Sequence, residues 1–233
     1  MTLEVATHRS VLIRILKDIY NDMELAPFLG FKGGTATYLF YGLNRFSVDL
    51  DFDLLEGVNE DLIFKKIENI LVEYGSLLDV RKKRFSFFYL LSYDNKIQNA
   101  YNIKVEVNRR NFGSKYEIKS YLGIAMKVMV LEDIVANKIV ATFEREGKAN
   151  RDIFDVYFFL KNNCPINEKI IQVRTNMRIQ EFWKKFINLL EGVNSRTILS
   201  GLGELIDAKQ KIWVKEKLIS EVIFLLKLKL NGT

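Results

Sequence analysis

The sequence predicts an α+β fold, in which a mixed sheet with flanking helices is followed by a helical C-terminal domain. Three observations support this prediction. Segments that alternate apolar and polar residues lie before about residue 130, runs with helical apolar spacing surround them, and from Leu131 onward the helical spacing continues alone. We therefore expect two domains, over residues 1–130 and 131–233.

The composition is that of a folded globular protein. Hydrophobic residues make up 48% of the 233 residues, including seventeen Phe and ten Tyr. The one cysteine, Cys164, excludes an intramolecular disulfide, and with one histidine, His8, the composition argues against a His/Cys metal site or a Cys–His nucleophile pair. Because the sequence shows neither a signal-peptide pattern nor an apolar run of membrane-spanning length, we expect a cytoplasmic protein with no membrane contact.

The net charge of +6 is unevenly spread. Residues 1–160 hold 22 basic and 22 acidic side chains, whereas residues 161–233 hold 13 basic and 7 acidic ones. This asymmetry favours a neutral catalytic part joined to an anion-binding part, although an ordinary solvated surface would also explain it.

The first half of the chain alternates between helical and strand patterns. We expect helices over 4–23, 35–42 and 59–74, and strands over 48–54, 77–81, 84–93, 101–109 and 126–130. Residues 110–122 look like an irregular excursion. The helices expected after residue 130 cover 131–145, 150–162, 166–174, 178–191, 195–207 and 209–229.

Three acids alternate with apolar residues along the predicted strand 48–54. Asp49, Asp51 and Asp53 would share one face, while Leu50 and Phe52 enter the core. Carboxylates gathered on one face repel one another unless a cation lies among them. Because the ligands are oxygens alone, Mg²⁺ or Mn²⁺ is favoured over zinc. We predict that Asp49 and Asp51 bind the metal; solvated acids on an edge strand are the alternative.

A paired glycine precedes this strand. Gly33, Gly34 and Thr35 could form a backbone cradle for a triphosphate at a helix N-terminus, with Lys32 or Ser47 adding donors. A tight strand-to-helix turn is the alternative. Metal-binding carboxylates beside a phosphate cradle indicate nucleotidyl transfer.

Glu106 lies between two valines in the alternating run 101–109. If the valines face the core, Glu106 faces the side of the sheet on which the other acids lie. It is a candidate third metal ligand or general base. It could equally be a solvent-facing residue, or pair with Lys104 or Arg109.

Charged residues lie within two apolar helices of the second half. Lys138 with Arg145, and then Arg151, Asp152 and Asp155, occupy such positions. Buried charges are costly unless paired, so these residues form either a catalytic cluster or an ion pair that locks the helices together. Composition and spacing alone leave both open.

A basic run, Arg81-Lys82-Lys83-Arg84, falls between two predicted strands. It is either a hairpin tip that contacts phosphates or a solvated turn.

Taken together, these residues resemble the AbiEii/AbiGii toxin family, a branch of the DNA polymerase β-type nucleotidyltransferase superfamily. The resemblance runs from Lys32 to about Leu160. It rests on Gly33-Gly34-Thr35 followed by Arg45-x-Ser47-x-Asp49-x-Asp51-Phe52, on Val105-Glu106-Val107, and on Lys138 with Arg151-Asp152-x-x-Asp155. The helices after residue 160 carry no matching motif.

The resemblance implies a minimal nucleotidyltransferase fold, Mg²⁺ (or Mn²⁺) and a nucleoside triphosphate substrate. It implies that Asp49 and Asp51 hold the metal, that Lys138 contacts the nucleotide phosphates, and that Asp152 supports catalysis. It also implies a toxin of a two-gene toxin–antitoxin or abortive-infection system, with a cognate antitoxin partner. Some members of the family modify tRNA 3′ ends.

We therefore expect a toxin that transfers NMP from an NTP to an RNA acceptor, the tRNA 3′ end in particular. Glu106 or Asp152 would orient or deprotonate the acceptor hydroxyl. Two alternatives stay open: a nucleotidyltransferase acting on a small molecule or a protein, and a nucleotide-binding interaction protein without catalysis.

Overall fold

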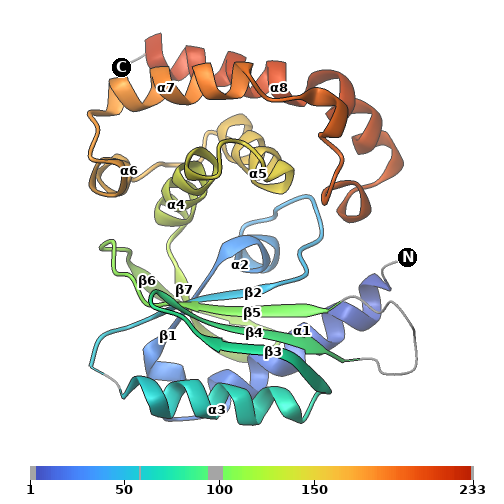
Figure 1. The fold of residues 1–233 in the computed structure, drawn as a ribbon, viewed down its shortest axis with the longest axis vertical. Coiled ribbons are helices and arrows are strands. Elements are labelled where there is room, and N and C mark those ends of the chain that lie inside the picture. Colours follow the sequence, from blue (N-terminus) through green and yellow to red (C-terminus); the bar gives the residue numbers. More distant parts are fainter. Residues whose placement is uncertain (1–3, 58, 94–101, 232–233) are drawn as a thin grey trace. The chain divides into compact units, whose positions relative to one another are not determined.

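The computed structural model describes residues 4–57, 59–93 and 102–231. The chain divides into two compact units (Figure 1). Unit 1 comprises Met1–Gly42, Phe46–Asn111 and Lys115–Met129, and unit 2 comprises Leu43–Arg45, Phe112–Ser114 and Val130–Thr233. Among the described helices, none is long and apolar enough to span a membrane.

Unit 1 is built on a seven-stranded mixed sheet with the strand order β3-β4-β5-β2-β1-β7-β6. Two neighbouring pairs, β1 with β7 and β2 with β5, are parallel, and the other pairs are antiparallel. This confirms the predicted α+β class with a mixed sheet. The strands are β1 (Leu29–Lys32), β2 (Leu50–Leu54), β3 (Ser76–Lys82), β4 (Ser86–Ser92), β5 (Ile103–Asn108), β6 (Tyr116–Tyr121) and β7 (Ile124–Met129).

Helices cover both faces of this sheet. Helices α1 (Val5–Asn21) and α3 (Glu60–Val72) lie on one face, and α2 (Gly33–Phe40) lies on the other (Figure 1). A short 3-10 helix, η1 (Ala26–Phe28), leads into β1. Phe52 of β2 packs against Tyr20 of α1, with ring centroids 6.4 Å apart. Since side chains alternate along a strand, Asp51 therefore points to the face that carries α2.

The expected excursion over 110–122 was wrong in its second half, which forms the edge strand β6. Tyr116–Tyr121 pairs with β7 through a tight turn in which Leu122 has φ +50° and Gly123 has φ +81°. Two successive residues with positive φ are characteristic of a two-residue hairpin turn. The strand escapes prediction because, at the sheet edge, Ile118 is 68% exposed and the apolar side chains do not separate into one buried face.

Unit 2 is helical after residue 130. Its α-helices are α4 (Leu131–Glu144), α5 (Asn150–Lys161), α6 (Glu168–Thr175), α7 (Ile179–Glu191) and α8 (Ala208–Asn231). Its core is rich in aromatic residues: Phe182, Trp183 and Phe186 of α7 are fully buried, and Phe143 of α4 packs against Phe182 with ring centroids 5.1 Å apart.

The helix expected over 195–207 was also wrong. The described chain there forms two 3-10 turns, η2 (Ser195–Thr197) and η3 (Gly203–Leu205). Gly201, with φ +67°, interrupts the helical path. The buried Asn150 side chain donates to the carbonyls of Thr197 (2.8 Å) and Ser200 (3.0 Å), which a continuous helix would use internally.

Candidate active site

The turn from β1 into α2 requires glycine at position 33. Gly33 has φ +77°, a conformation that side chains with a Cβ rarely adopt. A Cβ at this position would also lie 2.5 Å from Oδ2 of Asp51. The backbone at the start of α2 therefore passes directly beside the Asp51 carboxylate.

Hydroxyl groups tie the same turn to the acidic segment. The Thr35 hydroxyl donates to the backbone carbonyl of Asp49 and lies 3.0 Å from the Ser47 hydroxyl. Thr35 and Ser47 are both buried, as is Gly34. Asp49 comes just before β2, which begins at Leu50 rather than at the predicted residue 48. The structure thus brings the glycine turn, Ser47 and Asp49 together, as the sequence predicts.

Asp51 and Glu106 are direct neighbours on the parallel strands β2 and β5. The ammonium of Lys104 lies between their carboxylates, 3.3 Å from Oδ1 of Asp51 and 3.2 Å from Oε2 of Glu106. Asp51 above all, and then Asp49 and Glu106, raise the pKa of Lys104 against the opposite effect of burial. Of the two ion-pair partners expected for Glu106, Lys104 is the one that pairs with it, and Arg109 pairs with Glu60 instead.

This arrangement attracts positive charge, as a divalent cation site must. No three His, Cys, Asp or Glu side chains gather as a metal-binding group among the described residues, so Glu106 is not seen as a third ligand. The Lys104 ammonium instead lies between Asp51 and Glu106. The carboxylate oxygens of these acids are donors of the type that Mg²⁺ and Mn²⁺ prefer. The acids fit the expected metal in charge and donor type.

Asp53, the third acid of the strand, has a different task. It is buried and accepts hydrogen bonds from Lys32, from Asn108 (2.6 Å) and from the Tyr116 hydroxyl (2.6 Å). Lys32 is therefore engaged with Asp53, which does not match its expected role as an additional phosphate donor. These contacts join four strands of the sheet, β1, β2, β5 and β6.

A further residue beside the acidic segment, which the motifs do not include, is His8, fully buried on α1. Its ring nitrogens lie 2.9 Å from the Tyr93 hydroxyl and 2.9 Å from the backbone carbonyl of Val48, the residue before Asp49. Burial lowers the pKa of His8. His8 thus holds the entry to the acidic segment. Its spacing of four and seven residues from the buried Leu12 and Ile15 is the signal that it lies on the buried helix face.

Unit 2 holds a network of five charged side chains that is largely buried, with the exposed Arg145 at one end. Asp155 accepts two hydrogen bonds from Arg45, at 2.6 and 2.7 Å, and lies 3.0 Å from Nζ of Lys138. Lys138 also donates to Asp152 at 2.8 Å, and Arg145 donates to the other oxygen of Asp152. Arg45, which belongs to the first motif, is thus the partner of an acid from the last motif.

The charges of this network stabilise one another. Burial alone would raise the pKa of Asp152, but Lys138 and Arg145 outweigh it and lower that pKa to about 2. Burial would likewise lower the pKa of Lys138, and the two aspartates outweigh it and raise that pKa. Asp152 is therefore an anion and Lys138 a cation at neutral pH.

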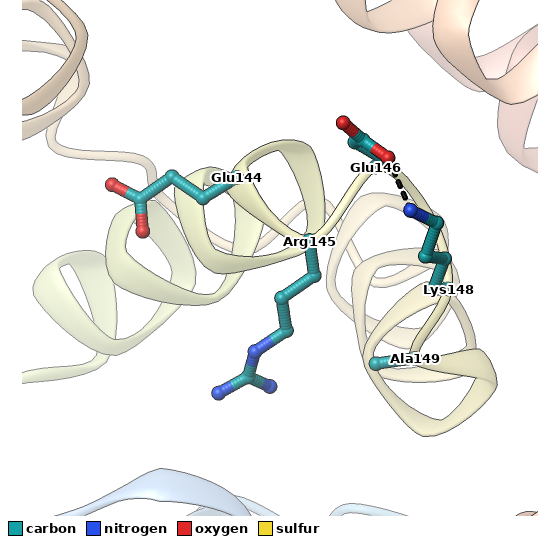
Figure 2. A pocket seen from close by; sticks show the side chains of 5 residues that line it. All are labelled: Glu144, Arg145, Glu146, Lys148 and Ala149. Carbon is teal, nitrogen blue, oxygen red and sulfur yellow. Dashed lines mark hydrogen bonds and ion pairs between the residues drawn. The ribbon is translucent and has the colours of Figure 1, made fainter.

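A shallow hollow of about 460 Å³ lies between the end of α4 and the start of α5 (Figure 2). It is lined by Glu144, Arg145, Glu146, Lys148 and Ala149. Figure 2 shows Glu146 and Lys148 paired with each other and Arg145 extending away from them. Since Arg145 also binds Asp152, the hollow gives solvent a path to one end of the charged network.

Comparison with known proteins places the chain in a family. The profile of the nucleotidyl transferase AbiEii toxins of type IV toxin–antitoxin systems matches residues 14–210. The chain belongs to this family. It is accordingly a nucleotidyltransferase toxin, with a nucleotide substrate and an antitoxin partner. The resemblance drawn from the motifs is confirmed.

Solved structures share its fold. A candidate nucleotidyltransferase from H. pylori is 23% identical, with a TM-score of 0.61 and coverage of 100% of this chain and 98% of that one. JHP933 from Helicobacter pylori is 24% identical, with a TM-score of 0.60 and coverage of 100% and 96%. MenT4, a nucleotidyltransferase toxin from Mycobacterium tuberculosis, is 16% identical, with a TM-score of 0.54 and coverage of 96% and 92%. A search of curated proteins gives no match.

Proposed function

We propose that this AbiEii family member transfers NMP from an NTP to the 3′ hydroxyl of an RNA, the tRNA 3′ end in particular, in a Mg²⁺- or Mn²⁺-dependent reaction in the cytoplasm. The 3′ oxygen bonds to the α-phosphorus while the bond between the α- and β-phosphates breaks, and pyrophosphate and the hydroxyl proton are released. The observation that carries the proposal is the Asp51–Lys104–Glu106 cluster. It lies on the face of the sheet that carries α2, and the Gly33 turn lies directly beside Asp51. It combines attraction for cations with a close backbone approach.

In this proposal, Asp49 and Asp51 hold the metal. A bound divalent cation would neutralise the triphosphate charge as it develops during in-line displacement. Glu106, on the neighbouring strand, orients the acceptor hydroxyl.

The Gly33–Thr35 turn would receive the triphosphate. No side chain caps the N-terminus of α2, which lies in the described part of the chain, so its first backbone N–H groups are available to an anion. The buried Thr35 hydroxyl donates to the backbone carbonyl of Asp49 and lies 3.0 Å from the Ser47 hydroxyl, which ties the turn to the acidic segment. We assign them the role of holding the turn in shape around the phosphates.

Lys138 and Asp152 are proposed as site residues on the family resemblance. A carboxylate with a pKa of about 2 is a weak base, so orienting Lys138 suits Asp152 better than accepting a proton does. Lys138, held as a cation, would contact the nucleotide phosphates.

The basic excess of residues 161–233 would contact the RNA backbone, because phosphate contacts dominate recognition of RNA helices. The cognate antitoxin would suppress this activity.

The test is incubation of the purified protein with Mg²⁺, each labelled NTP in turn, and total tRNA. We expect label in the tRNA fraction, and its loss in Asp49→Ala. Asp61→Asn is the matched control, since Asp61 is an exposed acid at the start of α3. Absence of transfer in the wild type, or full transfer by Asp49→Ala, would overturn the proposal; label on protein or small molecules instead of RNA would overturn the choice of acceptor.

A further inference from the structure

The hairpin between β3 and β4 ends in an exposed basic turn with an aromatic residue beside it. Residues 81–85 are all exposed, and Phe85 is 50% exposed. The end of β5 runs alongside, because the backbone N–H of Arg109 donates to the carbonyl of Phe85 at 2.8 Å. We call Lys83, Arg84, Phe85 and Arg110 the basic tip.

Two guanidinium groups flank the exposed ring. Arg84 lies 4.9 Å and Arg110 5.7 Å from the centroid of the Phe85 ring. An exposed phenylalanine contributes little to folding because half its surface stays in water. Arginines beside an aromatic face form a surface on which a base can stack.

Neighbouring cations are neutralised, whereas two at the tip are not. Arg81 pairs with Asp79, and Lys82 pairs with Asp61. For Lys83 and Arg84, no carboxylate lies within ion-pair distance among the described residues. Lys83 rests on the Phe88 ring, with Nζ 4.2 Å from the centroid. Positive charge is therefore concentrated on the turn.

Hydrogen bonds from Arg109 fix the backbone of the turn. Arg109 donates from Nη1 to the carbonyls of Lys83 (3.0 Å) and Arg84 (3.1 Å), while its other nitrogens bind Glu60 of α3. A backbone hydrogen bond from the Lys83 N–H to the Ser86 carbonyl, at 2.8 Å, closes the turn. The exposed side chains thus project from a fixed backbone, which lowers the entropy lost on binding.

We propose that the basic tip binds a single-stranded segment of RNA, with Lys83, Arg84 and Arg110 on its phosphates and a base stacked on Phe85. Cations interleaved with an exposed ring match an unpaired strand, because a duplex keeps its base faces covered. The inference deepens the proposed function by naming a contact surface for the RNA acceptor, and it rests on that function.

The test is fluorescence anisotropy of a short labelled single-stranded RNA with the full chain, in the absence of NTP and divalent metal. Because a stacked base contributes about 1–3 kcal/mol, we expect Phe85→Ala to weaken binding about tenfold and Phe85→Trp to retain it. The matched control is Leu78→Ala, which removes another exposed apolar side chain from the same hairpin.

Salt dependence tests the phosphate contacts. Each phosphate contact on a single strand contributes about 0.7 to the slope of log K against log salt, so the double variant K83A/R84A should lower the slope by about 1.4. K17A/K65A removes two lysines from exposed positions on α1 and α3, and should leave the slope unchanged.

Wild-type affinity in Phe85→Ala, or an unchanged slope in K83A/R84A, would overturn the inference. So would binding of an acidic protein in place of RNA. Because this assay needs no catalysis, RNA binding through the tip without any NMP transfer would refute the proposed function alone. Transfer to RNA with no effect of the tip variants would refute the inference alone.

Discussion

Lys104→Met tests the electrostatics of the acidic cluster most directly. The substitution keeps a flexible apolar stem and removes the ammonium that lies 3.3 Å from Asp51 and 3.2 Å from Glu106. In water-like surroundings, one charge pair at such a distance is worth about 1 kcal/mol. The side chains of Lys104 and Asp51 are each 28% exposed and that of Glu106 is 34% exposed, so solvent screens the cluster substantially.

We therefore expect the metal-free Lys104→Met protein to lose about 1–2 kcal/mol of its free energy of unfolding, since the carboxylates then repel one another. The same lost interaction should favour a divalent cation, because the ammonium no longer competes for Asp51, one of the two proposed metal ligands. Each 1.4 kcal/mol is a factor of ten in affinity, so Mn²⁺ should bind about 5–30-fold more tightly. Mn²⁺ should also restore the lost stability.

Electron paramagnetic resonance of free Mn²⁺ gives the dissociation constant, and thermal melts with and without Mn²⁺ give the stabilisation. Lys119→Met is the matched control, since Lys119 pairs with the single carboxylate of Glu117 on the edge strand β6. Weaker or unchanged Mn²⁺ affinity in Lys104→Met would refute the view that this ammonium and a metal ion compete for Asp51.

Three further predictions concern the rest of the structure. Gly33→Ala should lower the free energy of unfolding by more than about 2 kcal/mol in urea titrations and weaken NTP binding, because its Cβ meets a carboxylate. The control Gly42→Ala has a similar φ of +72° but nothing within 4 Å, and should cost about 1 kcal/mol; equal losses would contradict the clash. Asp155→Asn should lower the free energy of unfolding, measured in urea titrations, by about 3–5 kcal/mol, because it leaves the buried Arg45 and Lys138 underpaired. The exposed control Asp61→Asn should lower it by less than about 0.5 kcal/mol. His8 has a lowered pKa, so the unfolded chain binds its proton more readily and stability should fall as the pH drops below about 6.5, levelling off only below the folded-state pKa. His8→Gln should flatten that slope in melts at several pH values, and an unchanged slope would show that other groups cause it.

Local patterns in the sequence determined much of the first unit. Alternation along two runs placed Asp51 and Glu106 on the same face of the sheet, because the side-chain period of a strand is fixed whatever its partner. The glycine turn followed from the same logic, since a strand that leads into a helix beside a carboxylate leaves no space for a Cβ at Gly33. The motifs then identified the family.

Only the tertiary structure decided which charges meet. Arg45 binds Asp155, which is 110 residues away, and His8 of α1 reaches the carbonyl of Val48, which is 40 residues away. From the sequence, Lys104 and Arg109 were equally good ion-pair partners for Glu106. In the structure Glu60 of α3 binds Arg109, the residue after β5, and Lys104 pairs with Glu106. Periodicity fixes the direction in which a side chain points, but a hydrogen bond or ion pair also needs a partner within about 3–4 Å. That distance is set by the packing of elements far apart along the chain.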